Sequence, residues 1–201
     1  MAISAILYFD ANDTTPDILE AYDEIVTEMG LPEFPAPGSI YHWAAPEAGG
    51  LRVCDVWQSQ EAFDNFMREK TIPMTARRGF KPPSVEITQV HETIAGNTTG
   101  TNGCGIFLEF DGDPGELKHQ VDRVNELMNA NENPPAGLYF HWSTTGPSSL
   151  RVYDHWRSRE DFDRFVETRL SPVLQRAGLP QPRIEYFHVH NAIDNHANVR
   201  L

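Results

Sequence analysis

Four of the eight histidines recur at one fixed spacing, and their side chains are the ones best suited to acid–base chemistry. His42 and His141 stand 99 positions apart, and so do His91 and His190. An imidazole titrates near neutral pH, so each could act as a general acid, a general base or a metal ligand. A histidine that recurs with the fold is also often a hydrogen-bonded structural residue, so both interpretations stay open.

A second pattern concerns metal binding. His188 and His190 are two positions apart, which places both imidazoles on one face of a strand and is compatible with chelation of zinc, iron or copper. The first-half counterpart begins with Gln89 and lacks this pair. His141 and His155 are the residues that could complete the site, but no third ligand is evident. We therefore predict no metal, with His188 and His190 as the one weak candidate pair.

The histidines belong to a long internal repeat. The stretch HWAAPEAGGLRVCDVWQSQEAFDNF, residues 42–66, returns as HWSTTGPSSLRVYDHWRSREDFDRF, residues 141–165, and the alignment runs without a gap from Ile18 against Leu117 to Ile94 against Ile193. Each half is therefore one complete unit. The sequence predicts a first domain over 1–94, a linker over 95–103, a second domain over 104–194 and a tail over 195–201.

The elements that position these residues follow from periodicity. Alternating apolar residues predict strands over 3–9, 39–45, 51–57 and 85–91, and helical stripes predict helices over 17–30 and from Ser59 onward, with a further helical turn over 73–79. The second half repeats this order: strand 105–110, helix 116–128, hairpin 138–156, helix 158–170 and strand 183–190. The pattern predicts two α+β ferredoxin-like β-α-β-β-α-β units. If the two sheets faced each other, they would close an intramolecular dimeric α/β barrel.

The returning hairpin strand presents two faces. Side chains alternate, so Leu51, Val53, Asp55 and Trp57 share one face, and Arg52, Cys54 and Val56 share the other. Because the first set is identical in the second half, we interpret Asp55 and Asp154 as scaffold. On the second face, Cys54 and Val56 are replaced by Tyr153 and His155 in the second half, as expected for a specialised pocket. The sequence does not say which face lines the barrel.

Barrel closure would bring the second strand of each unit beside the fourth strand of the other, so His42 is predicted to neighbour His190 and His141 to neighbour His91. We name as candidate catalytic residues His42, His141, His155 and His190. An aromatic, partly cationic group of strand residues suits a flat apolar ligand, although core packing and ion pairing are the commoner roles for such residues. These candidate substrate-binding residues are Trp43, Arg52, Trp142, Arg151 and Tyr153.

Composition and missing motifs exclude several function classes. A net charge of −13 and a pI near 4.9 argue against nucleic acid or an anionic membrane as partners. The N-terminal residues lack a signal-peptide pattern, so we expect a cytoplasmic protein. Cys54 and Cys104 occupy inequivalent repeat positions and are expected to be free thiols. The chain has no phosphate-binding glycine loop and no nucleophile elbow, so we predict no cofactor.

The segments GLRVCDVWQSQEAFDNF and SLRVYDHWRSREDFDRF, each followed by a proline-bearing turn and a strand ending in His91 or His190, resemble the dimeric α/β-barrel superfamily, in its antibiotic-biosynthesis-monooxygenase-like branch. That branch includes cofactor-independent monooxygenases, polyketide cyclases, haem enzymes, muconolactone isomerases and proteins without an assigned reaction. The resemblance therefore implies an enzyme that oxygenates or cyclises an aromatic or polyketide-like small molecule in the barrel without a nucleotide cofactor.

The alternative is a non-catalytic small-molecule-binding or accessory protein with the same fold. Fusion of two units allows one pocket to react while the other only supports the fold. We expect either a monomer that forms an intramolecular pseudo-dimer or a homodimer. A cavity of about 300 Å³ or more with converging His and Tyr side chains would favour an enzyme or a binding protein, whereas a packed interior would favour a structural role.

Overall fold

The computed structural model describes residues 1–11, 17–31, 33 and 35–198. The chain forms two compact units. Unit 1 consists of Met1–Ile87 together with Val189–Leu201, and unit 2 consists of Thr88–His188. The sequence predicted contiguous domains over 1–94 and 104–194, but the last strand segment of each repeat lies in the unit built mainly by the other repeat. Residues 199–201 of the predicted tail lie outside the described residues.

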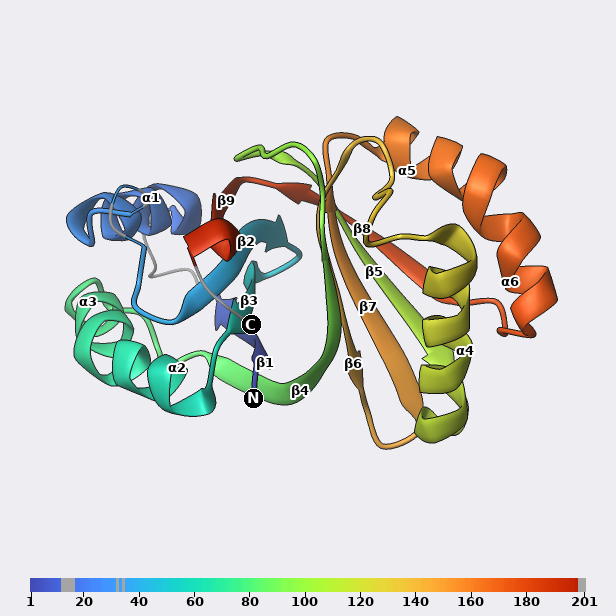
Figure 1. The fold of residues 1–201 in the computed structure, drawn as a ribbon. Coiled ribbons are helices and arrows are strands. Elements are labelled where there is room, and N and C mark those ends of the chain that lie inside the picture. The colour runs from blue at the N-terminus through green and yellow to red at the C-terminus, as the bar shows by residue number, and fades with distance from the viewer. Residues whose placement is uncertain (12–16, 32, 34, 199–201) are drawn as a thin grey trace. The chain divides into compact units, whose positions relative to one another are not determined.

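Unit 1 combines a five-stranded sheet with three helical segments on one face (Figure 1). The strands follow the hydrogen-bonded order β4-β1-β3-β2-β9. Their bounds are Ile3–Asp10 for β1, Ser39–Glu47 for β2, Gly50–Trp57 for β3, Ser84–Ala95 for β4 and Asn191–Asp194 for β9. The helices are α1 (Ile18–Glu28), α2 (Gln60–Phe66) and α3 (Ile72–Arg77), with a π-helical turn, Met67–Thr71, between the last two and a 3₁₀ turn, His196–Asn198, after β9.

Unit 2 repeats this arrangement with the strand order β8-β5-β7-β6-β4, where β4 contributes its second half. Its other strands are β5 (Gly103–Asp111), β6 (Leu138–Thr145), β7 (Ser149–Trp156) and β8 (Arg183–Val189). The helices are α4 (Pro114–Met128), α5 (Arg159–Phe165) and α6 (Ser171–Ala177), with a π-helical turn, Val166–Leu170, between the last two. The predicted linker 95–103 is shortened by one residue at each end, because β4 runs to Ala95 and β5 begins at Gly103.

Helix starts are fixed by side-chain caps that the sequence carries at the right positions. The Ser59 hydroxyl accepts a hydrogen bond from the Ala62 amide at 3.2 Å, which confirms the predicted start of α2, and Ser158 caps α5 in the same way through Asp161. Such a cap satisfies one of the four amide groups that a helix start leaves without an intrahelical partner. The structure continues α2 into α3, so the predicted helical turn over 73–79 is part of one longer helical segment.

Gly38 and Gly137 occupy one equivalent turn in which only glycine fits. Gly38 has φ +84°, and a Cβ at this position would stand 2.7 Å from the Cβ of Ala62. At Gly137, φ is +90° and the corresponding atom would stand 2.8 Å from the Asp161 side chain. Both the left-handed backbone and the close approach of the following helix exclude a side chain here. The turn therefore positions β2 and β6 under the helices.

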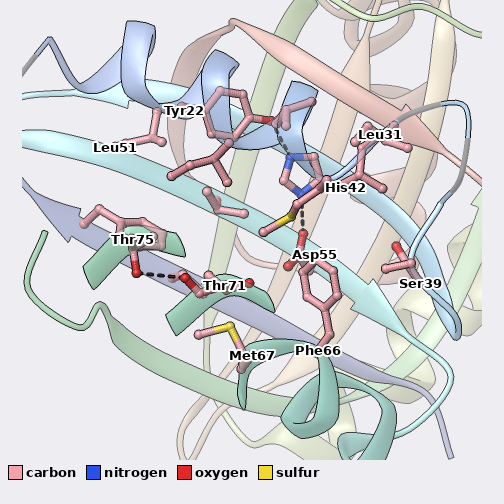
Figure 2. A pocket seen from close by; sticks show the side chains of 18 of the residues that line it. Tyr22, Leu31, Ser39, His42, Leu51, Asp55, Phe66, Met67, Thr71 and Thr75 are labelled. Carbon is pink, nitrogen blue, oxygen red and sulfur yellow. Dashed lines mark hydrogen bonds and ion pairs between the residues drawn. The ribbon is translucent and has the colours of Figure 1, made fainter. Parts of the chain in front are cut away.

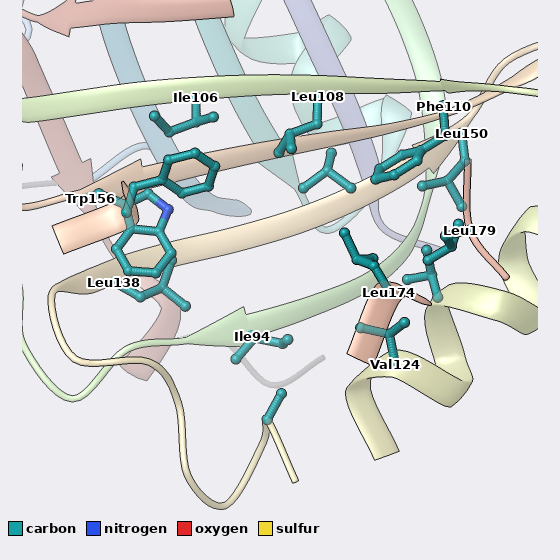
Figure 3. Packing of buried hydrophobic residues seen from close by; sticks show 14 of the residues in the cluster. Ile94, Ile106, Leu108, Phe110, Val124, Leu138, Leu150, Trp156, Leu174 and Leu179 are labelled. Carbon is teal, nitrogen blue, oxygen red and sulfur yellow. The ribbon is translucent and has the colours of Figure 1, made fainter. Parts of the chain in front are cut away.

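Each unit has its own apolar core between its sheet and its helices. In unit 2, Trp156 packs on Phe162 and Phe165 at ring-centroid distances of 5.6 and 5.2 Å, and Figure 3 shows Trp156 with neighbouring members of this cluster. In unit 1, Trp57 packs on Phe63 and Phe66 at 5.8 and 5.2 Å. Leu51, Val53 and Trp57 all belong to the unit 1 core. The strand face that both repeats share is therefore the face that the helices cover.

Candidate functional site

Three polar side chains of unit 1 form a hydrogen-bonded chain under the helices. Asp55 on β3 lies opposite His42 on β2, and its Oδ1 is 2.7 Å from His42 Nδ1. The other ring nitrogen, Nε2, is 2.7 Å from the hydroxyl of Tyr22 on α1. Figure 2 shows the three groups in sequence, from Asp55 on the sheet to Tyr22 on the helix. The arrangement is a carboxylate–imidazole–phenol relay, in which the carboxylate orients the ring.

Asn191, the first residue of β9, adds a hydrogen bond to the outer end of this relay. Its side-chain amide donates a hydrogen bond of 3.2 Å to the Tyr22 hydroxyl oxygen. Since the carboxylate of Asp55 accepts the Nδ1 proton, a neutral His42 has no proton on Nε2, and the Tyr22 hydroxyl donates to it. Burial raises the pKa of Tyr22, against a smaller opposing effect of the Asn191 hydrogen bond. The phenol therefore keeps its proton at rest and can pass it to His42 only when another proton replaces it.

The relay borders a cavity of about 100 Å³ in unit 1. Tyr22, His42 and Asp55 form its polar corner, and the remaining wall is largely apolar, including Leu7, Phe9, Ile18, Ile25, Val53, Phe66, Met67 and Ile193. This volume does not reach the value of about 300 Å³ predicted above for an enzyme or a binding protein, the lower end of the range that drug-sized ligands occupy. It is comparable to the engineered cavity of about 150 Å³ that binds benzene in another protein. The cavity therefore suits one small ring or a part of a larger ligand.

His190 lies on the outer side of the same relay. Its Nε2 is 2.8 Å from Asp23 Oδ1, and its ring meets the Tyr22 ring edge-on at a centroid distance of 5.9 Å. The His42 ring is parallel to the Tyr22 ring, with the two centroids 6.1 Å apart. The predicted neighbourhood of His42 and His190 is thus realised through Tyr22, which lies between them.

Unit 2 has the same histidine with different partners. His141 Nδ1 is 2.7 Å from Asp154 Oδ1, as in unit 1, but Nε2 is 3.7 Å from a carboxylate oxygen of Glu92. Val121 occupies the position that corresponds to Tyr22. Burial acts to lower the pKa of His141, yet the two carboxylates outweigh it and raise this pKa to about 10. His141 is therefore a stable imidazolium at neutral pH.

Glu92 is held in place by further polar groups of unit 2. Asn125 donates to it at 2.7 Å and the Ser143 hydroxyl at 3.3 Å. Although burial acts to raise the pKa of Glu92, its contacts with His141 and Asn125 lower it overall. The strand that carries His91 pairs with the His141 strand, as predicted, and His91 contacts Asp122 at 2.7 Å, which repeats the His190–Asp23 pair. A smaller cavity of about 70 Å³ adjoins His141 and Asp154.

His155, the fourth predicted catalytic residue, does not join these groups. It lies on the opposite face of β7 from Asp154, its ring nitrogen is 3.2 Å from the Asn102 carbonyl oxygen, and its ring meets Tyr139 edge-on at 4.9 Å. Burial lowers its pKa to about 4. His155 is thus neutral at physiological pH, in surroundings separate from the His141 cluster.

The predicted substrate-binding residues also lie away from both cavities. Trp43 and Trp142 are fully buried and contribute to neither cavity wall, and Tyr153 stacks on Trp142 at 5.2 Å. Arg52 pairs with Glu47 and Arg151 with Glu109, each at 2.9 Å. The structure brings none of the five into the wall of the cavity that His42 borders.

The candidate metal pair, His188 and His190, gains no further ligand among the described residues. Among the residues that the structure describes, no group of three or more His, Cys, Asp or Glu side chains is placed to hold a metal ion, so His188 and His190 have no third ligand there. Nor does any helix in the described part of the chain combine the length and apolar character needed to cross a bilayer.

Two residues of the relay were missed as site residues. Tyr22 lies in the helix predicted over 17–30 but was not named as a site residue, and Asp55 was interpreted as scaffold because both repeats carry it. One signal was available in the sequence: a carboxylate is rarely buried without a partner, and the strand with the recurring histidine is the nearest source of one. The divergence of Tyr22 to Val121 and of Asn191 to Glu92 was also visible in the repeat alignment.

Comparison with known proteins places the fold. No protein-family model matches the chain, and neither does any curated protein. A structure from Fusobacterium nucleatum described as a candidate monooxygenase superimposes with a TM-score of 0.72 at 11% identity, covering 96% of this chain and 94% of that one. A second candidate monooxygenase, from Lactobacillus acidophilus, gives 0.68 at 10% identity and covers 96% of both chains.

A ferredoxin-fold protein from Listeria monocytogenes, described as related to antibiotic biosynthesis monooxygenases, gives a TM-score of 0.51 at 8% identity and covers 94% of this chain and 95% of that one. At such identities the likeness establishes the fold. The chain therefore has the α+β ferredoxin-like fold of monooxygenase-like proteins, as the sequence resemblance predicted.

Proposed function

We propose that the protein is a small-molecule enzyme of the antibiotic-biosynthesis-monooxygenase-like type, and that unit 1 is its reacting half. The observation that carries this proposal is the Asp55–His42–Tyr22 relay at the polar corner of an apolar cavity. We further propose that the fused units form an intramolecular dimeric α/β barrel in a cytoplasmic protein, either as a monomer or as a homodimer. The cavity itself lies on the helix-covered face of unit 1, whereas the sequence resemblance pointed to the barrel interior.

The relay supports proton abstraction from a neutral substrate. The substrate proton moves to the Tyr22 oxygen while the phenolic proton moves to His42 Nε2, and Asp55 stabilises the imidazolium that results. The substrate is left as an enolate or a phenolate, and the proton count is unchanged. Such an anion is the starting species both for ring closure and for direct reaction with O₂, the two outcomes that the resemblance implies. General acid–base catalysis of this kind contributes typically about 10²- to 10⁴-fold.

The cavity limits the substrate. An apolar wall and a volume of about 100 Å³ suit one aromatic ring bearing a carbonyl or hydroxyl group, not a fused polyketide skeleton. Neutral substrates are favoured because Asp55 already supplies a negative charge at the polar corner. Catalysis in this scheme needs no nucleotide cofactor, since every proton is carried by side chains of unit 1.

Deuterium exchange tests the proposal without requiring the natural substrate. Acetophenone, a one-ring ketone, is incubated in D₂O with the protein, and loss of its methyl proton signal is followed by NMR. We expect exchange above the buffer rate in the wild type, and a decrease of about 10²-fold or more in H42Q and in Y22F. H141Q, the matched change in unit 2, is expected to retain the wild-type rate. Exchange that stays at the buffer rate, or that survives in H42Q, would contradict the proposal.

The small cavity favours a second function, that of a non-catalytic binding or accessory protein. In that case acetophenone would bind saturably and shift the methyl signals of cavity residues such as Ile25 and Ile193 without exchanging its protons. H42Q would then lower the affinity for acetophenone by about 10-fold, the contribution of one hydrogen bond. No variant would change the rate of deuterium exchange into acetophenone.

A further inference from the structure

One strand position is occupied by different residues in the two units. It lies beside the His42 strand in unit 1 and beside the His141 strand in unit 2. We infer that the residue at this position, Asn191 in unit 1 and Glu92 in unit 2, is a positioning residue that determines whether the neighbouring histidine accepts protons or is a fixed cation. Its consequence for catalysis rests on the proposed function, whereas its consequence for histidine protonation does not.

The two positions are equivalent in register. Asn191 pairs with Ala44 on β2, and Glu92 pairs with Ser143 on β6, two residues after His42 and His141 respectively. Each therefore lies on the strand that borders its histidine strand. The histidine–aspartate hydrogen bond on the other side is 2.7 Å in both units. The hydrogen bond that each ring makes through Nδ1 is thus the same, and the groups that face the two rings differ on the Nε2 side.

In unit 1, the group facing Nε2 can both donate and accept. Tyr22 donates to a neutral imidazole and can accept from an imidazolium, and Asn191 supports either state through its amide hydrogen bond to the Tyr22 oxygen. The other charged groups near His42 are Asp55 and the His190–Asp23 pair beyond Tyr22. His42 can therefore gain and lose a proton without leaving a buried group unpaired.

In unit 2, the group facing Nε2 can only accept. Glu92 is ionised, and the charged groups around His141 are Asp154, Glu92 and the more distant His91–Asp122 pair. A neutral His141 would present a lone pair to a carboxylate, so the proton stays on the ring.

The surroundings of each unit match this assignment. The residues that donate hydrogen bonds to Glu92 are Asn125 and Ser143, and the corresponding residues of unit 1 are Val26 and Ala44, which have no polar side-chain atom. Unit 1 is thus built for a neutral group at this strand position, and unit 2 is built for a carboxylate. The site in unit 2 cannot act as a proton acceptor at neutral pH, which assigns it a structural role.

The test exchanges the charge at this position and reads the protonation state directly. Ring nitrogen signals of His42 and His141 are followed by NMR across pH and assigned with H42Q and H141Q. We expect E92Q to lower the titration midpoint of His141, and N191E to raise that of His42, each by one to three pH units. N191Q is the control, because glutamine has the shape of glutamate without the charge. In the exchange assay at pH 7, N191E is expected to be at least about 10-fold slower than N191Q, whereas E92Q is expected to match the wild type.

Equal His42 titration in N191E and N191Q, or an unchanged His141 midpoint in E92Q, would overturn the inference. If N191E does not fold, the E92Q measurement decides the matter alone. Shifted midpoints without any acetophenone exchange in the wild type would refute the proposed function and leave the role of this position intact. Acetophenone exchange in the wild type together with unshifted midpoints would support the proposed function and refute the role of this position.

Discussion

The charge on His141 predicts that the protein loses stability between pH 7.0 and pH 8.5. The pKa of this histidine is raised to about 10 in the folded state, whereas an unfolded histidine titrates near 6.5. Above pH 6.5 the unfolded chain releases this proton and the folded chain keeps it. The free energy of unfolding therefore falls by about 1.4 kcal/mol per pH unit, or about 2 kcal/mol over this range. The contribution is fully present below pH 6.5 and is gone above pH 10.

Urea unfolding at fixed ionic strength, followed by tryptophan fluorescence, measures this loss. The range stops at pH 8.5 because the pKa values of buried Cys54 and Tyr22 are raised by burial, and these groups would add their own losses at higher pH. Each unit contains two tryptophans, so a biphasic curve would reveal separate unfolding of the units. H141Q is the control and should unfold with a free energy nearly constant over the same range. A wild-type stability that is flat or rises from pH 7.0 to 8.5, or an equal slope in H141Q, would refute the reasoning.

Three further predictions concern the relay, the turn before β2 and the acid side of the stability profile. Asp55→Asn removes the charge that stabilises the His42 imidazolium, so acetophenone exchange should fall by about 10²-fold, while Asp154→Asn should leave it unchanged; equal effects of the two changes would contradict the assignment of chemistry to unit 1. Gly38→Ala should destabilise by about 3 kcal/mol in urea unfolding, since its Cβ would meet Ala62 at 2.7 Å in addition to the strain of a positive φ. Gly79→Ala, at φ +80° with open space around it, should cost only about 1 kcal/mol, and similar losses for the two glycines would disprove the steric argument. Burial lowers the pKa of His155 to about 4. Below pH 6.5 this histidine therefore binds a proton in the unfolded chain but not in the folded chain. The free energy of unfolding should fall by about 1.4 kcal/mol per pH unit from pH 6.5 toward pH 4. His155→Gln should flatten this acid limb by that amount, and an unaltered limb would show that other groups cause it.

The fold was largely predictable because local patterns and long-range packing agree. The stripe of Ile18, Tyr22 and Ile25 gives α1, the Ser59 cap gives α2, and the alternation around Asp55 gives β3. The strand adjacency that brings His190 near His42 followed from edge pairing in the expected barrel. The division into the two units was not predicted from the repeat. The chain passes from one unit into the other within β4 and within the β8–β9 segment, and the repeat pattern gives no indication of these crossings.

The site was predictable only in part, for a reason that lies in the repeat itself. Identity between the halves was interpreted as scaffold and difference as function, and on that basis Tyr153 and His155 were favoured over Asp55. The relay combines both classes: His42 and Asp55 are shared by the two halves, whereas Tyr22 and Asn191 differ from Val121 and Glu92. Under the proposed function, the histidine–aspartate pair is thus kept in both copies while its neighbours decide which copy reacts.

The crossing of strands between units also explains what fusion of the two repeats allows. Asn191 belongs to the second repeat but completes the histidine site of unit 1, and Glu92 belongs to the first repeat but completes that of unit 2. In a symmetric dimer of a single repeat, one residue would fill this position in both sites, and a neutral partner and a carboxylate could not coexist. One chain that encodes both repeats removes this constraint. The two sites can then divide their roles, one with a histidine free to exchange protons and one with a histidine held as a cation by two carboxylates.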